Sequence, residues 1–204
     1  MPNHPRVVFI ASLRRSGSTL LDLLLSAHPG FVGVGEVCRL FEHGGAWLDR
    51  LDQEQCSCGL AASECPFWAG LLPRLREKRG ASIQENYAAV LNHFSEVLGH
   101  DTVLIDSSKT INAFRALGAI RELDLRAIHL IRDVRSWTCS SHRGLQRQGP
   151  TGLLASLRRH PTREALTRWF EGTAIGSFLT WQRGNRAIAS ALAVSRGIQN
   201  AGVA

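Results

Sequence analysis

The stretch Val7-Val-Phe-Ile-Ala-Ser-Leu-Arg-Arg-Ser-Gly-Ser-Thr-Leu-Leu21 decides the fold of this chain. It predicts a buried strand, a tight loop of small residues, and a helix that begins at the hydroxyl residues Ser18 and Thr19. The unpaired N–H groups and the positive dipole end of a helix N-terminus suit a cluster of anionic oxygens. Two adjacent arginines, Arg14 and Arg15, lie in the loop. The sequence therefore predicts a cradle for a phosphate-like group.

The loop departs from the nucleotide-binding pattern G-x-x-x-x-G-K-[ST] at residues that contact ATP. Aligned on Gly17, the pattern places Ser18 at its lysine and Thr19 at its metal-binding hydroxyl. The lysine that reaches the β/γ-phosphates is missing, whereas Arg15 precedes Gly17 by two residues. A guanidinium can hold two oxygens of a phosphate or a sulfate without a metal. The alternative interpretation is an ordinary helix start that is capped by the hydroxyls of Ser16 and Ser18.

Two further apolar stretches end in polar clusters. They are Val103-Leu-Ile-Asp-Ser-Ser-Lys109 and Arg126-Ala-Ile-His-Leu-Ile-Arg-Asp-Val-Arg135. Strands that alternate with helices predict an α/β fold, here a three-layer α/β/α domain with a central parallel sheet, similar to P-loop NTPases. Ligands of such sheets bind at the carboxyl ends of the strands. We therefore expect Arg15, Lys109 and Arg132 at one edge of the sheet, although each alone also fits a solvated charge.

Two motifs of the chain resemble those of the sulfotransferase family. Leu13-Arg-Arg-Ser-Gly-Ser-Thr-Leu-Leu21 is similar to the 5′-phosphosulfate loop of the family, and Ile131-Arg-Asp-Val-Arg-Ser-Trp-Thr-Cys-Ser140 is similar to its 3′-phosphate motif. The resemblance implies transfer of a sulfuryl group from 3′-phosphoadenosine 5′-phosphosulfate (PAPS) to a hydroxyl or an amine. The residues that it assigns to the 5′-phosphosulfate are Arg15, Ser16, Gly17, Ser18 and Thr19, and those that it assigns to the 3′-phosphate are Arg132 and Ser140. We also expect Arg14 to bind the cofactor.

The resemblance also implies catalytic roles for Arg15, Lys109 and Glu36. The run Asp106-Ser-Ser-Lys109 is similar to the second strand end of the family, where a lysine approaches the transferring group. Related tyrosylprotein sulfotransferases carry a Gly-Glu-Glu run at a similar spacing, and this chain has a single acid there, Glu36. Glu36 would take the acceptor proton; the alternative is a surface carboxylate of a loop. His28 is a rival base, although its Ser-Ala-His-Pro-Gly context favours a helix end.

No metal is expected. A sulfuryl group carries less negative charge than a phosphoryl group, so cationic side chains and backbone N–H groups can stabilise the leaving phosphate. Cys56-Ser-Cys58 and Cys65 could form a metal knuckle, but their spacing lacks a clear second pair of ligands. We therefore expect a short disulfide or buried thiols. Similar Cys-x-Cys-Gly and Cys-Pro-Phe-Trp runs resemble those of bacterial sulfotransferases.

The composition fits one globular domain that binds a polyanionic cofactor. The chain has 204 residues, a length sufficient to bury a core, and a formal net charge of +7. Only Lys78 and Lys109 are lysines and the arginines are scattered, so we expect no nucleic acid as partner. Asp22 interrupts the apolar residues 20–25, and no apolar run reaches the length of a membrane span. The apolar residues 7–11 are too few for a signal peptide, so we expect a cytoplasmic protein.

The middle of the chain predicts a helical insertion over residues 49–99, with one helix over residues 83–98. It either walls an acceptor pocket or covers the sheet. Residues 144–163, which are rich in Gly, Arg and Pro, predict a mobile loop. Residues 164–195 are predicted to be largely helical.

The resemblance covers the front part of a typical family domain. In the family, a helix with a Trp-x-x-x-Asn pattern is followed by another strand, further helices and a late loop over the nucleotide. Here the pattern is Trp181-Gln-Arg-Gly-Asn185, and the residues from there to Ala204 do not provide these later elements. We expect this to weaken activity, so a nucleotide-binding protein without turnover is one alternative. A P-loop kinase with Asp106 on Mg²⁺ is another, against which the missing lysine argues. The acceptor (small molecule, carbohydrate or lipid) and the oligomeric state are not predicted.

Overall fold

The computed structural model describes residues 4–56, 58–146 and 173–201. In chain order, with η for a 3₁₀ helix, the elements are β1 (Arg6–Ser12), α1 (Ser18–Ser26), β2 (Phe31–Gly33), η1 (Val37–Leu40), η2 (Glu42–Gly45), η3 (Leu51–Gln53), α2 (Pro66–Glu77), α3 (Ile83–Leu98), β3 (Val103–Lys109), α4 (Ile111–Gly118), β4 (Asp124–Leu130), α5 (Val134–Gln146) and α8 (Ala174–Ala201). The chain divides into two compact units. We call Met1–Ala11 with Ser18–His129 the sheet unit, and Ser12–Gly17 with Leu130–Ala204 the loop unit.

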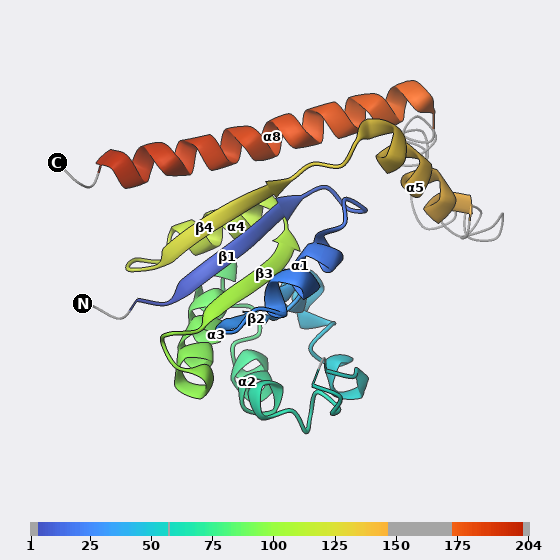
Figure 1. Ribbon diagram of the computed structural model, residues 1–204. Coiled ribbons are helices and arrows are strands. Elements are labelled where there is room, and N and C mark those ends of the chain that lie inside the picture. The colour runs from blue at the N-terminus through green and yellow to red at the C-terminus, as the bar shows by residue number, and fades with distance from the viewer. Residues whose placement is uncertain (1–3, 57, 147–172, 202–204) are drawn as a thin grey trace. The chain divides into compact units, whose positions relative to one another are not determined.

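A four-stranded parallel sheet in the order β2-β3-β1-β4 forms the centre of the sheet unit (Figure 1). Arg6 of β1 and Phe31 of β2 both pair with Val103 of β3, so three strands begin at the same level. The two central strands, β1 and β3, are almost entirely buried, as expected for parallel strands that are covered on both faces. The predicted α/β fold with a parallel sheet is confirmed.

Helices cover both faces of this sheet. Helix α1 packs on β2 and β3, and Figure 1 shows it in front of the sheet, with α4 behind. Helix α3 packs against α4 and α2. The three layers α/β/α are therefore present within the sheet unit.

The predicted insertion contains η3, α2 and α3. Helix α3 has the predicted bounds, and Ser82 caps it in a capping box with Glu85. Of its apolar residues, Tyr87, Val90, Leu91 and Phe94 are buried. Val97 and Leu98 are exposed, because the last turn of the helix reaches into solvent.

In the loop unit, α5 contacts α8. Gly184 of α8 lies so close to Leu13 that a Cβ there would be 2.6 Å from Leu13 Cδ2, so a larger residue would force the Leu13 side chain to move. The helix predicted over residues 164–195 is confirmed from Ala174 onward. The predicted loop over residues 144–163 is wrong for 144–146, which end α5, and its remainder lies outside the described residues. In the part of the chain that the structure describes, no helix has both the length and the apolar character to cross a bilayer.

Candidate functional site

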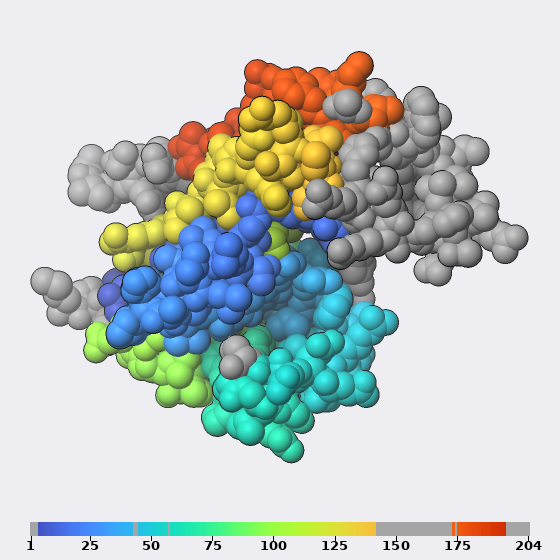
Figure 2. Space-filling model, turned by 45° about the vertical axis from the view of Figure 1, so that its right-hand side comes forward, coloured from blue at the N-terminus to red at the C-terminus, as the bar shows by residue number. Residues whose placement is uncertain are grey.

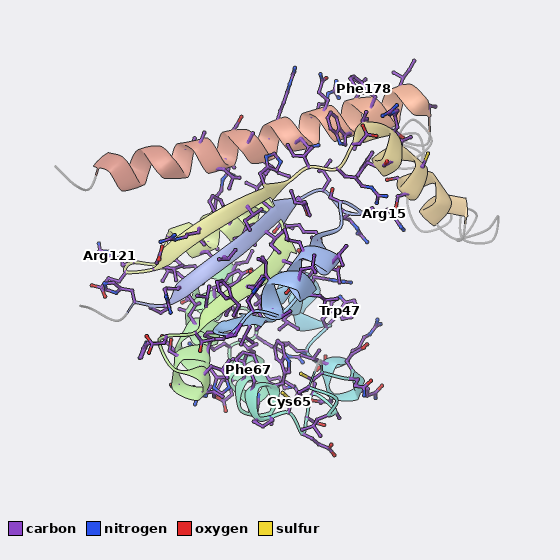
Figure 3. All side chains as sticks on the ribbon, viewed as in Figure 1. Arg15, Trp47, Cys65, Phe67, Arg121 and Phe178 are labelled. Carbon is purple, nitrogen blue, oxygen red and sulfur yellow. The ribbon has the colours of Figure 1, made fainter. Side chains whose placement is uncertain are left out.

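Of the residues predicted to bind the 5′-phosphosulfate, residues 14–17 lie in the loop unit, whereas Ser18 and Thr19 begin α1 in the sheet unit. Arg14 and Arg15 are exposed, whereas Ser16 is buried; Figure 3 shows Arg15 on this loop. Arg15 has a φ of 65° and Gly17 a φ of 97°. The left-handed region costs a residue other than glycine on the order of 1–3 kcal/mol and is found preferentially at functional sites. The loop therefore holds Arg15 in a strained conformation.

Side chains of the second predicted motif hold the backbone of this loop. Arg132 Nη1 donates to the Arg15 carbonyl at 2.9 Å, and Trp137 Nε1 donates to the Arg14 carbonyl at 2.8 Å. Trp181 Nε1 of α8 donates in turn to the Arg132 carbonyl at 2.9 Å. Because a trans peptide directs its N–H opposite to its C=O, the contact with Trp137 turns the Arg15 N–H away from this tryptophan. The structure thus brings the two motifs together.

Arg132 lies two residues before the first residue of helix α5, and Ser140 is a half-buried residue within it. Asp133 caps the helix: its Oδ1 accepts from the backbone N–H groups of Arg135 at 3.1 Å and Ser136 at 3.2 Å. The hydrogen bond from the Ser136 backbone lowers the pKa of Asp133, and the charge of Arg135 lowers it further by a smaller amount. Asp133 therefore caps the helix, and the assignment of Arg132 and Ser140 to a phosphate stays a prediction.

The sheet unit holds the other two predicted catalytic residues. Lys109 Nζ donates to Glu36 Oε1, and Glu36 Oε2 lies 3.7 Å from Arg39 Nη1. The Lys109 side chain is 11% exposed and that of Glu36 is 34% exposed. The carboxylate of Glu36 thus lies between two cations and is held in place from both sides.

A bulge at the end of β3 sets the direction of Lys109. Phe9 of β1 pairs with Asp106 and Ala11 with Lys109, so β3 contains one extra residue in this interval. Lys109 itself has a φ of 68°, in the left-handed region. Both predicted cations of the transfer step, Arg15 and Lys109, are therefore in an unfavourable backbone conformation.

Two adjoining pockets of about 290 and 460 Å³ open beside the start of α1. Thr19 lines both of them, and Glu36 lines the smaller one. The residues that the two pockets share are Thr19, Asp22, Val34, Gly35, Leu51 and Trp68. Figure 2 shows this face, with α1 in blue beside the residues around 40–60 in cyan. Residues of the insertion therefore line both pockets, and their role toward an acceptor stays a prediction.

Asp106, which the kinase alternative places on Mg²⁺, is fully buried. Its carboxylate accepts from the hydroxyl of Tyr87 at 2.6 Å and from the backbone N–H of Ser108 at 2.8 Å. Burial raises the pKa of Asp106 to about 6. A carboxyl group that is enclosed and bonded in this way is not open to a metal and a nucleotide, which argues against the kinase alternative.

Asp22 is a buried acid that sequence reasoning missed. The Ser107 hydroxyl donates to its Oδ2 at 2.7 Å, and burial raises its pKa. A side chain at Gly33 would clash with Asp22 and Ser26, so β2 needs a glycine beside this helix. The available signal was the single acid within the apolar residues 20–25, which indicates a buried polar contact.

His28 is exposed and follows the end of α1. Its backbone N–H donates to the Leu25 carbonyl at 3.1 Å, and its carbonyl accepts from the Phe31 N–H at 3.2 Å. The interpretation of His28 as part of a helix end is confirmed.

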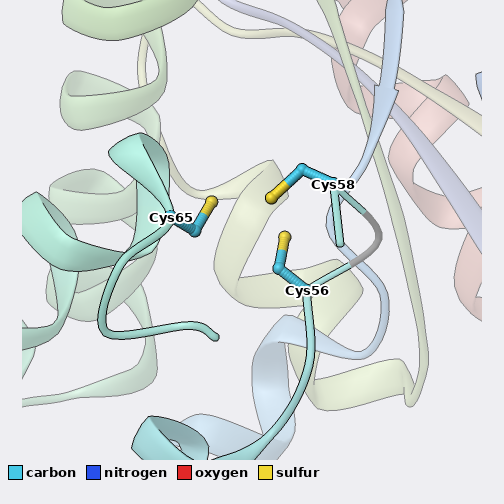
Figure 4. Close-up of side chains that lie close together, drawn as sticks. All are labelled: Cys56, Cys58 and Cys65. Carbon is cyan, nitrogen blue, oxygen red and sulfur yellow. The ribbon is translucent and has the colours of Figure 1, made fainter. Parts of the chain in front are cut away.

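The sulfur atoms of Cys56, Cys58 and Cys65 lie within 4.8 Å of one another (Figure 4). Cys58 and Cys65 carry free thiols, so the predicted disulfide is wrong for these two residues. Cys65 is buried as predicted, whereas Cys58 is exposed. Three sulfur atoms this close together indicate a metal site more specifically than the sequence spacing of the cysteines does.

The chain matches a model of a known protein family. The family model described as "Sulfotransferase family" matches residues 5–186 of the chain. The search of curated proteins and the search of solved structures each found no match.

Proposed function

Since the chain belongs to the sulfotransferase family, whose chemistry is sulfuryl transfer, we propose that it takes the sulfuryl group from PAPS and passes it to a hydroxyl or an amine. The acceptor is a small molecule, a carbohydrate or a lipid. The observation that carries the proposal is the contact of Arg132 and Trp137 with the carbonyls of Arg15 and Arg14. It joins the two motifs that a donor with phosphates at its 5′ and 3′ positions would need.

The donor set of the loop fits a phosphosulfate. Arg14 and Arg15 offer exposed guanidinium groups, and Gly17 brings the chain to the N-terminus of α1 in a backbone conformation that suits glycine. The residues that we propose for the 5′-phosphosulfate are Arg14, Arg15, Ser16, Gly17, Ser18 and Thr19. For the 3′-phosphate we propose Arg132 and Ser140.

In the transfer step, Glu36 takes the proton of the acceptor hydroxyl. The acceptor oxygen then bonds to sulfur while the bond between sulfur and the bridging oxygen breaks, and the electron pair stays on the leaving phosphate. Arg15 and Lys109 stabilise the charge that grows on this phosphate. Before the acceptor arrives, Lys109 and Arg39 keep the Glu36 carboxylate in place.

The pairing of Glu36 also favours a second candidate function. A carboxylate between Lys109 and Arg39 is satisfied without a substrate, which suits a structural ion pair. The protein would then bind the nucleotide without turnover. This candidate function keeps all the proposed cofactor contacts and differs only in that Glu36 does not act as a base.

Transfer of ³⁵S from labelled PAPS to a panel of alcohols, amines, sugars and lipids tests the proposal. We expect a labelled product without added metal, and tight calorimetric binding of 3′-phosphoadenosine 5′-phosphate (PAP). PAP binding with no product from any acceptor would support the binding protein. Mg²⁺-dependent binding of ATP, together with no binding of PAP, would contradict both candidate functions.

A further inference from the structure

We propose that Cys56, Cys58 and Cys65 together bind one zinc ion. The sulfur atoms of all three converge within 4.8 Å (Figure 4). Around a tetrahedral zinc with Zn–S bonds of about 2.3 Å, three sulfurs lie about 3.8 Å apart. The cysteines therefore need to move by at most about 1 Å, which small rotations of their side chains provide.

The backbone builds this arrangement. The Cys56 N–H donates to the Leu60 carbonyl at 2.8 Å and the Gly59 N–H donates to the Cys56 carbonyl at 2.9 Å, so Cys56, Gly59 and Leu60 close a tight turn. Gly59 has a φ of 89°, which a residue with a side chain would adopt only with strain. This turn presents Cys56 and Cys58 as a pair, as the knuckles of structural zinc sites do.

Cys65 is attached to the same turn and begins helix α2. Its backbone N–H donates to the Ala61 carbonyl at 2.9 Å, next to the bridge between Gln55 and Ala61. The backbone N–H groups of Phe67 and Trp68, at the start of α2, donate to its sulfur. The third ligand is therefore fixed relative to the first two.

Packing does not explain the cluster. A cysteine that serves as a small apolar side chain is buried, whereas Cys58 is exposed and still faces the other two sulfurs. A disulfide would use only two of the three residues. Three sulfur ligands at one point suit a thiophilic, tetrahedral ion, which is zinc.

Binding replaces the protons of the three thiols by one Zn²⁺, so three protons are released and the net charge of the chain falls by one. Among the described residues, no further His, Cys, Asp or Glu joins the three sulfurs, so the proposed site has three protein ligands here and a fourth position that is open to water. Cys56 also lines the larger pocket with Trp68. The ion would thus fix one wall of that pocket, and the site does not depend on whether the chain turns over.

Metal analysis of the purified full chain, with Cys139→Ser as control, tests the proposal. Cys139 is an exposed cysteine of α5 outside the cluster. After addition of zinc and removal of the excess by gel filtration, we expect one zinc per chain in the wild type and in Cys139→Ser. Cys58→Ser and Cys65→Ser should lose it. Equal zinc in the wild type and in Cys58→Ser would overturn the proposal.

A cobalt titration of the wild type keeps the test independent of the folding of the variants. In the reduced, metal-free chain, Co²⁺ should produce thiolate-to-metal absorption and the strong visible bands of a tetrahedral site, which zinc then removes. Zinc should also protect three cysteines from alkylation, as counted by mass spectrometry. Absence of the cobalt bands, or a disulfide between two of these cysteines that persists with reductant and zinc present, would contradict the proposal.

Discussion

The two units differ in how the polar side chains near the predicted site are bonded. In the sheet unit, two side chains donate to carboxylates: Lys109 to Glu36, and Tyr87 to the fully buried Asp106. In the loop unit, Arg132 and Trp137 bond to backbone carbonyls of a loop whose own arginines stay exposed. The first arrangement satisfies charges internally, whereas the second shapes a backbone and leaves cations open to an anion. The sheet unit should therefore respond to mutation through proton transfer and stability, and the loop unit through ligand binding.

The largest effect is expected for Glu36→Gln. If Glu36 takes the acceptor proton, turnover should fall by roughly 10²–10⁴-fold, the usual contribution of a positioned general base. The amide keeps the shape but removes the basicity, so PAP affinity should stay unchanged. Steady-state kinetics and calorimetry check this. A lower melting temperature with proportionate losses of binding and rate would show that Glu36 is structural.

A somewhat smaller effect is expected for Arg15→Ala. Arg15 should act on charge that develops in the transition state, and only such differential interactions raise the chemical rate. We expect turnover to fall by about 10²–10³-fold, as for the loss of one oxyanion donor, with a much smaller loss of PAP affinity. Single-turnover rates measure the effect on turnover, and PAP titrations measure the effect on affinity. Intact turnover would assign this role to Arg14 or to the backbone.

In the sheet unit, Asp106→Asn should change the pH dependence of stability. The pKa of Asp106 is raised from 3.8 to about 6, so between these values the folded state keeps a proton that the unfolded state releases. The contribution of this group to the free energy of unfolding is fully present below about pH 4. It falls by about 3 kcal/mol as pH rises to about 6. Urea unfolding from pH 4 to 7 should show the stability of the wild type relative to the variant falling over this range. A difference that does not vary with pH would contradict the burial argument.

A smaller effect is expected for Trp137→Phe. The variant removes the bond to the Arg14 carbonyl, a net loss of about 1 kcal/mol, and keeps an aromatic ring in place. PAP should bind about 5-fold more weakly because the loop is less well ordered. The matched control is Trp47→Phe, a tryptophan of the sheet unit that lines the smaller pocket and stacks with Arg39. Equal losses in both variants would show that the effect is not specific to the loop.

Much of the fold was predictable because its elements have strong local signals. The apolar runs of β1 and β3 and the periodicity of α3 were sufficient. Strand β2 was not predicted, because Phe31–Gly33 has three residues and ends in a glycine that is needed for the approach to Asp22. A strand this short is defined by its pairing with β3 and not by its own sequence.

The site was predictable in its residues but not in its contacts. The motifs identified Arg15 and Arg132, yet the role of Trp137, within the second motif, depends on a hydrogen bond across 123 residues. The pairing of Glu36 with Lys109 likewise depends on the bulge in β3. Contacts between distant segments follow from tertiary packing, which periodicity and motif spacing do not encode.

The central claim is that the Arg132 motif and the Arg15 loop form one site for a nucleotide with two phosphate positions. Calorimetric titration of Arg132→Ala with PAP and with adenosine 5′-phosphate tests it most directly. The control is Arg126→Ala, which removes the same charge from an exposed side chain of β4. A charge-assisted hydrogen bond contributes about 1.5–3 kcal/mol, so PAP affinity should fall by about 10–100-fold. The affinity for adenosine 5′-phosphate should fall much less, and the control should bind both as the wild type does. Equal losses for the two nucleotides in Arg132→Ala would remove Arg132 from the 3′-phosphate and contradict the account.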